Sequence, residues 1–105
     1  NNNSIRRIYD SSFINVINLK TLYLSFNLIE SIGRSSFYCL KYLRVLDLSH
    51  NNLKKIENDL FRFENQIQEL NLSHNELIEI NEPCFIQMEN LKELNMSFNK
   101  LGYIH

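Results

Sequence analysis

Apolar residues recur along this chain with a period of 24 positions. Blocks beginning at Leu19, Leu43, Ile67 and Leu91 follow the template LxxLxLxxNxLxxIxxxxFxxL, in which x is any residue. In the complete blocks only Glu64 misses one of the eight template columns. Self-similarity at a fixed period of this length is typical of solenoid proteins, in which each repeat forms one turn of a coil.

The period divides the chain into a partial repeat (1–18), three complete repeats (19–42, 43–66 and 67–90) and a second partial repeat (91–105). In each repeat the LxL alternation, as in Leu46-Asp47-Leu48, predicts a short strand with one buried face. Successive strands are expected to stack in parallel on the inner side, while the remaining residues return along a wider outer side. Neither end carries a capping repeat, so we expect a fragment of a longer solenoid.

One polar column interrupts the apolar ones and contains Asn3, Asn27, Asn51, Asn75 and Asn99. A side-chain amide has two donors and one acceptor, so stacked asparagines can bond the backbone groups left free where each strand ends. With two glycines and one proline in the chain, the asparagine ladder is the predicted turn-maker. Its expected role is structural.

A second column holds Phe13, Phe37, Phe61 and Phe85 on the return segment of each repeat. Bulky rings are needed there to fill the space between layers, so we interpret this column as core and not as an aromatic binding site. Beside it, Phe63 is expected to turn inward in place of Glu64.

The segments Leu46-Asp47-Leu48-Ser49-His50-Asn51 and Leu70-Asn71-Leu72-Ser73-His74-Asn75 make the pattern specific. Over its whole length the chain resembles the typical 24-residue class of leucine-rich repeats, as in Toll-like receptor ectodomains, Slit-type proteins and small proteoglycans. The resemblance implies an α/β-type solenoid, a right-handed arc with a parallel concave β-sheet and an irregular or short-helical convex side. It also implies a non-enzymatic protein-protein interaction module in the ectodomain of a receptor or adhesion protein.

The template leaves free the outward columns on and beside the strands, where a partner is expected to bind. The candidate ligand-binding residues of this concave face are Tyr23, Phe26, Arg44, Asp47, His50, Glu69, Asn71, His74, Glu93, Asn95 and Phe98. Their mixed charge favours a protein partner over a polyanion. The serine that follows each LxL is assigned no binding role.

Four of these candidates form a row of rings directly before the ladder asparagines: Phe26, His50, His74 and Phe98. Two interpretations stay open, an anchor stripe for a partner or half-buried packing against the turn. The two histidines also suggest a zinc site, with Asp47 or Glu69 as the third ligand. Two histidines are a weak donor set, however, and we expect no metal site and no cofactor.

Charge and composition exclude further classes of function. The 11 basic and 12 acidic residues are scattered and leave a formal charge of −1, so nucleic acid is not an expected partner. No apolar run approaches the roughly 18 to 20 residues that cross a bilayer, and no membrane contact by this segment is expected. No serine or cysteine has a histidine and a carboxylate placed around it for catalysis.

Cys39 and Cys84 lie in different columns of different repeats, so no disulfide between them is expected.

Glycosylation sequons begin at Asn2, Asn71 and Asn95, each a possible N-glycosylation site in a secreted protein. Glycans at Asn71 and Asn95 would obstruct the concave sheet. We expect an extracellular or cell-surface location. The alternative is a cytoplasmic regulatory solenoid that scaffolds or inhibits an enzyme domain elsewhere in its chain, and a glycan on the native protein would distinguish the two.

Overall fold

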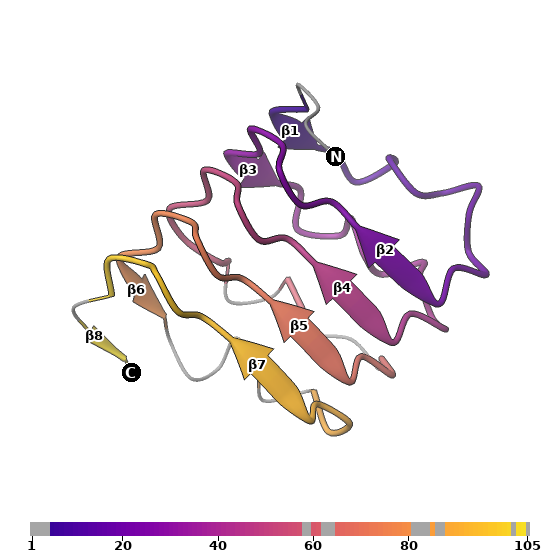
Figure 1. Ribbon diagram of the computed structural model, residues 1–105. Coiled ribbons are helices and arrows are strands. Elements are labelled where there is room, and N and C mark those ends of the chain that lie inside the picture. The colour runs from indigo at the N-terminus through magenta and orange to yellow at the C-terminus, as the bar shows by residue number, and fades with distance from the viewer. Residues whose placement is uncertain are drawn as a thin grey trace.

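The LxL segments form the strands of one parallel sheet. The computed structural model describes residues 5–57, 60–61, 65–80, 85, 88–101 and 103–104. The sheet has the order β2-β4-β5-β7, and its strands are β2 (Thr21–Tyr23), β4 (Val45–Asp47), β5 (Glu69–Asn71) and β7 (Glu93–Asn95) (Figure 1). The register pairs Leu22 with Leu46, then Leu70, then Leu94, so each residue lies beside its equivalent in the next repeat. The predicted parallel sheet is confirmed.

A second line of strands runs along the opposite edge of the coil and was not predicted by the LxL pattern. It consists of β1 (Arg7–Ile8), β3 (Ser31–Ile32), β6 (Glu79–Ile80) and β8 (Tyr103–Ile104). The strands pair in parallel as β1-β3 and β6-β8, again at equivalent positions of two repeats (Figure 1). Strand pairing on this second side therefore joins the first two and the last two repeats of the coil.

The convex return is irregular. Residues 10–15 and 34–39 consist of consecutive turns, and Phe85 lies in a 3₁₀ turn. Of the two expected forms of the convex side, the described residues show the irregular one and contain no α-helix. In the same part of the chain, no helix is long and apolar enough to span a bilayer.

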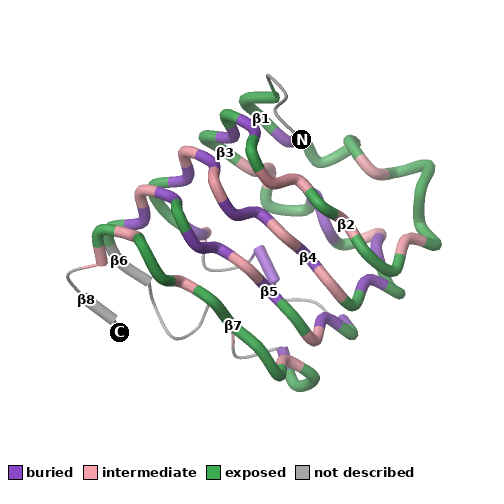
Figure 2. Tube along the Cα trace, viewed as in Figure 1, coloured by how far each residue is buried: buried purple, intermediate pink, exposed green. Residues whose placement is uncertain are grey.

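The core lies between the sheet and the return, as the buried stretches of the two middle strands show in Figure 2. Phe37 and Phe61 are fully buried, and the phenylalanine column stacks with ring centroids 5.9 to 6.5 Å apart. Leu94 departs from the expected inward burial, because it is 36% exposed. It lies on β7, the last strand of the sheet order, so a neighbouring layer covers it on one side alone.

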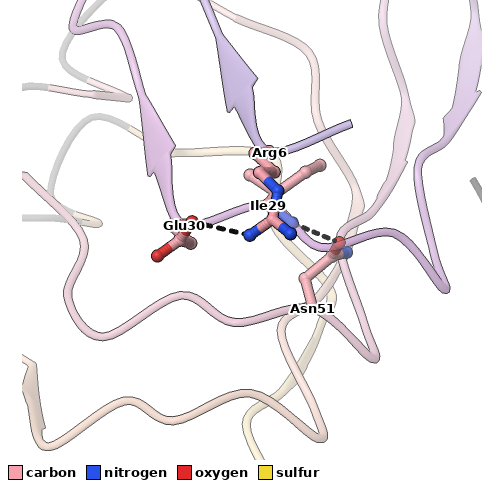
Figure 3. A network of polar contacts seen from close by, with 4 residues as sticks. All are labelled: Arg6, Ile29, Glu30 and Asn51. Atoms are coloured by element: carbon pink, nitrogen blue, oxygen red, sulfur yellow. Dashed lines mark hydrogen bonds and ion pairs between the residues drawn. The ribbon is translucent and has the colours of Figure 1, made fainter. Parts of the chain in front are cut away.

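The asparagine ladder satisfies the backbone at the end of each strand. The Asn51 amide donates to the carbonyls of Leu24, Leu48 and Ser49 at 3.0 to 3.1 Å. Its Oδ1 accepts the backbone N–H of Ile29 at 3.1 Å (Figure 3). Since donors and acceptor are all used and Asn51 is buried, the geometry supports a structural role.

Asn75 and Asn99 repeat this arrangement, with the Leu53 and Leu77 backbone N–H groups donating to them at 3.0 Å. The rung at Asn27 is less complete, because its buried Oδ1 has no hydrogen-bond partner among the described residues. Beside the ladder, Figure 3 also shows the Arg6–Glu30 ion pair. Both of its side chains are more than half exposed, so the pair contributes little stability.

Several predictions fall on residues outside the described ranges, namely those on Asn2, Asn3, Phe63, Glu64 and Cys84. Cys39 is described and is a free, half-buried thiol that donates to the Phe13 carbonyl at 3.3 Å.

Candidate functional site

The concave face extends beyond the strands themselves, because the backbone ladder continues on both sides of them. The Arg44 N–H donates to the Lys20 carbonyl at 2.7 Å before the strands, and the Phe26 N–H donates to the Ser49 carbonyl at 3.2 Å after them. Since the ladder fixes the backbone, the outward side chains project from a defined surface. Within β4 the pleat buries Leu46 and leaves Val45 and Asp47 partly exposed on the other face.

An open hollow of about 520 Å³ lies over the four strands of the sheet. Six of the candidate residues line it: Tyr23, Asp47, Glu69, Asn71, Glu93 and Asn95. Val45 and Lys92 also line it and were not among the candidates, although they occupy the same outward columns. Arg44 and the ring row lie outside the lining.

The central outward column is fixed by the serine that follows it two positions later. Asp47 Oδ1 accepts both the backbone N–H of Ser49 at 2.9 Å and its hydroxyl at 2.6 Å. Asn71 with Ser73, and Asn95 with Ser97, repeat both bonds. The serine column therefore orients the side chains at the centre of the face, a role that sequence reasoning missed. The signal was the constant two-residue spacing between an Asp or Asn and a Ser, which is that of an Asx turn.

The row of rings is one continuous stack. Ring centroids from Phe26 to His50, from His50 to His74, and from His74 to Phe98 are 4.1, 4.1 and 4.3 Å apart, and neighbouring planes differ by 9 to 11°. All four residues have positive φ, between 55 and 58°. This left-handed conformation is uncommon outside glycine and marks the sharp turn before each ladder asparagine. Sequence reasoning gave the turn to asparagine alone.

The ring row is accessible at both ends. Phe98 is 73% exposed and Phe26 is 47% exposed, and His74 is exposed as well. The rings thus pack against one another and also present exposed surface that a partner could contact.

The same stacking bears on the zinc hypothesis for His50 and His74. An imidazole binds a metal through a nitrogen lone pair in the ring plane, and two rings stacked face to face with planes 9° apart do not converge on one ion. Across the residues that the structure describes, no group of three or more His, Cys, Asp or Glu side chains is placed to hold a metal.

Comparison with known proteins identifies the family. The family model for leucine-rich repeats matches residues 1–53 and 41–101. The chain belongs to the leucine-rich repeat family. Among solved structures, the leucine-rich repeat domain of APL1B is similar, with a TM-score of 0.94 and 26% sequence identity. That match covers 98% of this chain and 30% of the APL1B chain, so this chain spans less than a third of that protein's length. No curated protein matches.

Leucine-rich repeat domains are generally protein-interaction modules without catalytic activity. In this domain the side chains of the Ser-His neighbours have different partners. The Ser49 hydroxyl donates to Asp47, while the His50 ring is stacked between Phe26 and His74. The Ser49 hydroxyl therefore donates to a carboxylate and not to the neighbouring imidazole, as a nucleophile-base pair would require.

Proposed function

We propose that this leucine-rich repeat domain binds a protein ligand on its concave face, as part of a receptor or adhesion ectodomain. The observation that carries the proposal is the open face itself. Its outward side chains vary from repeat to repeat over a backbone that does not, and they surround a hollow of about 520 Å³. A fixed scaffold with variable outward positions is the general basis of recognition by solenoid proteins.

Exposed aromatic side chains on this face support a protein as the ligand. Tyr23 is 67% exposed on β2, and Phe26 and Phe98 end the ring row. Large aromatic residues are enriched among the residues that contribute most to protein-protein binding energy. With polar Asp47, Asn71 and Asn95 between them, the face combines aromatic anchors and hydrogen-bonding groups.

A pair of tyrosines provides the test. Tyr23 lies in the hollow, while Tyr42 lies on the turn before β4, away from the hollow lining, and is 51% exposed. A display library of extracellular proteins would be screened for binders of the wild-type domain, and each binder measured against Tyr23→Ala and Tyr42→Ala. We expect Tyr23→Ala, but not Tyr42→Ala, to weaken binding at least tenfold, with the circular dichroism melts of both variants unchanged.

Phe26→Ala and His50→Ala extend the test to the ring row. If binders retain full affinity for Tyr23→Ala and for both row variants, the concave face is not the binding surface and the proposal fails. Loss of affinity for Tyr42→Ala alone would place binding on another surface.

The extracellular location is part of the proposal and has its own test. Asn95 is exposed and Asn71 is half-buried on the concave side, so glycans on both would obstruct the hollow that the ligand is proposed to occupy. Mass spectrometry of the native protein is expected to find a glycan on at least one of Asn2, Asn71 and Asn95, but not on Asn71 and Asn95 together. The competing function, an intracellular regulatory solenoid, is favoured by the free thiol of Cys39 and would be supported by unmodified sequons.

A further inference from the structure

The concave face has two chemically different halves. On β2 and β4, the first outward column holds Thr21 and Val45, which carry no charge. On β5 and β7, the same column holds Glu69 and Glu93. The change occurs between adjacent strands of one sheet, so it lies within the reach of a single bound segment.

The acidic half contains a pair of like charges, Glu69 and Glu93. Glu69 and Glu93 are in register on neighbouring strands, which are about 4.7 to 4.9 Å apart in a sheet. Like charges opposite each other on one sheet face are destabilising. Neither carboxylate forms an ion pair with any described residue, although Lys92 lines the same hollow. A cation supplied from outside would relieve this repulsion.

The other half presents apolar surface. Tyr23 is 67% exposed and lines the hollow beside half-buried Val45. Outside the first outward column, charges of both signs also line the hollow, namely Asp47 on β4 and Lys92 directly before β7. The two halves therefore differ in that first column, which is uncharged on β2 and β4 and acidic on β5 and β7, and this difference would fix the direction in which a partner lies.

We propose that the hollow docks a protein segment that places a basic side chain over Glu69 and Glu93 and an apolar side chain against Tyr23 and Val45. This inference rests on the proposed function and names the chemistry of its ligand. An arginine fits the acidic position best, because its planar guanidinium bonds two carboxylates through separate N–H groups.

The strand spacing sets the separation of the two side chains in the partner. The apolar position lies over β2 and β4 and the acidic position over β5 and β7, so their centres are two strand spacings, or about 9.5 Å, apart. In an extended segment, residues four apart lie on the same side and about 13 Å from each other, and the long, flexible stem of arginine covers the difference of a few ångströms. The expected ligand therefore carries its apolar and basic residues four positions apart and crosses the strands.

Two capped heptapeptides serve as probes, Gly-Leu-Ser-Gly-Ser-Arg-Gly and the same sequence with neutral citrulline in place of arginine. Binding is measured by titration with observation of the backbone amide NMR signals. With the arginine peptide, we expect shifts at Tyr23, Val45, Glu69 and Glu93. The citrulline peptide should bind at least threefold more weakly, because it keeps the shape and loses the charge.

The double variant Glu69→Gln/Glu93→Gln should reduce binding of the arginine peptide to the level of the citrulline peptide. Its matched control is Glu30→Gln/Glu89→Gln, which changes net charge equally at two exposed sites outside the hollow lining. The control should leave the affinity unchanged.

Equal binding of the two peptides, equal effects of the two double variants, or no detectable shifts with the arginine peptide would each overturn the inference. If the shifts map to the concave face without charge dependence, the proposed function stands and the inference alone fails. If they map to the convex side, the inference fails, and the proposed function is decided separately by the effect of Tyr23→Ala on a screened binder.

Discussion

Two columns of four aromatic rings run through this protein, and they differ in spacing and exposure. On the convex side the phenylalanine column, Phe13, Phe37, Phe61 and Phe85, has ring centroids 5.9 to 6.5 Å apart. At the edge of the sheet the ring row, Phe26, His50, His74 and Phe98, has centroids 4.1 to 4.3 Å apart. Both columns advance by one ring per repeat, so the difference in spacing reflects the curvature of the arc.

The rings of the two columns also differ in how much of their surface is exposed. Phe37 and Phe61 have no exposed surface, whereas Phe98 is 73% exposed. A ring enclosed on all sides contributes its whole apolar area to folding, while an exposed ring keeps most of its area for contact with another molecule. Periodicity alone therefore does not separate enclosed rings from accessible ones, but burial does.

The strongest test of this contrast is Phe61→Ala. Phe61 is fully buried between Phe37 and Phe85, and truncating such a ring removes transfer energy and leaves a cavity, at a cost of about 3 to 5 kcal/mol. The measurement is the free energy of unfolding from urea titration. A loss below about 1 kcal/mol would show that the return segment collapses around the cavity and that the column is not a rigid core.

Asn51→Leu tests whether burial, rather than aromatic character, determines how much a substitution lowers the free energy of unfolding. The substitution keeps a side chain branched at the γ position and removes every bond that Asn51 makes. The Ile29 N–H would lose its acceptor, while the carbonyls of Leu24 and Leu48 would keep one bond each, from Asn27 and Asn75. At about 1 to 3 kcal/mol for a buried group left unsatisfied, we expect a loss of about 1 to 3 kcal/mol. Tyr23→Ala is the exposed control, and a melting temperature of Asn51→Leu equal to that of Tyr23→Ala would contradict a structural ladder.

The sequence predicted the parts of the fold that repeat in residue type. Leu46 and Leu48 share a column with their equivalents in each repeat, so their inward direction and the register of the sheet follow from the period. Asn51 was interpreted correctly because an amide is the side chain suited to bond free backbone groups on both sides of a turn.

Features that depend on backbone conformation and on neighbouring layers were not predictable in the same way. The positive φ of His50 is set by the turn geometry and not by residue type, since Phe26 adopts the same conformation. In the pairing of β1 with β3, Ile8 and Ile32 share a template column, but Arg7 and Ser31 share no residue class, so the column alone does not predict a strand. At the candidate site, the columns were predictable, but the hollow and the contribution of Lys92 depend on side-chain packing across strands.

His50→Ala is expected to reduce stability by an amount between that of Phe61→Ala in the buried column and that of Phe98→Ala in the ring row. It removes two stacked contacts, each worth about 0.5 to 1.5 kcal/mol, and leaves a non-glycine residue at a φ of 56°. We expect a loss of about 1 to 2 kcal/mol in the free energy of unfolding. His50→Gly removes the same contacts but tolerates positive φ, so it should destabilise less than His50→Ala. The reverse order would show that the left-handed turn carries no strain.

Phe98→Ala should have the smallest effect on stability, because the ring is 73% exposed and is stacked on His74 alone among the described residues. Exposed substitutions of this kind usually change stability by about 0.5 kcal/mol or less. The order of effects on ligand affinity should be the reverse of the order of effects on stability. For a ligand that contacts the ring row, Phe98→Ala should weaken binding. Phe61→Ala, measured at a low temperature at which it is folded, should not. Calorimetric titration of both variants with one screened binder measures this. Equal losses of affinity would mean that the exposed row has no role of its own in recognition.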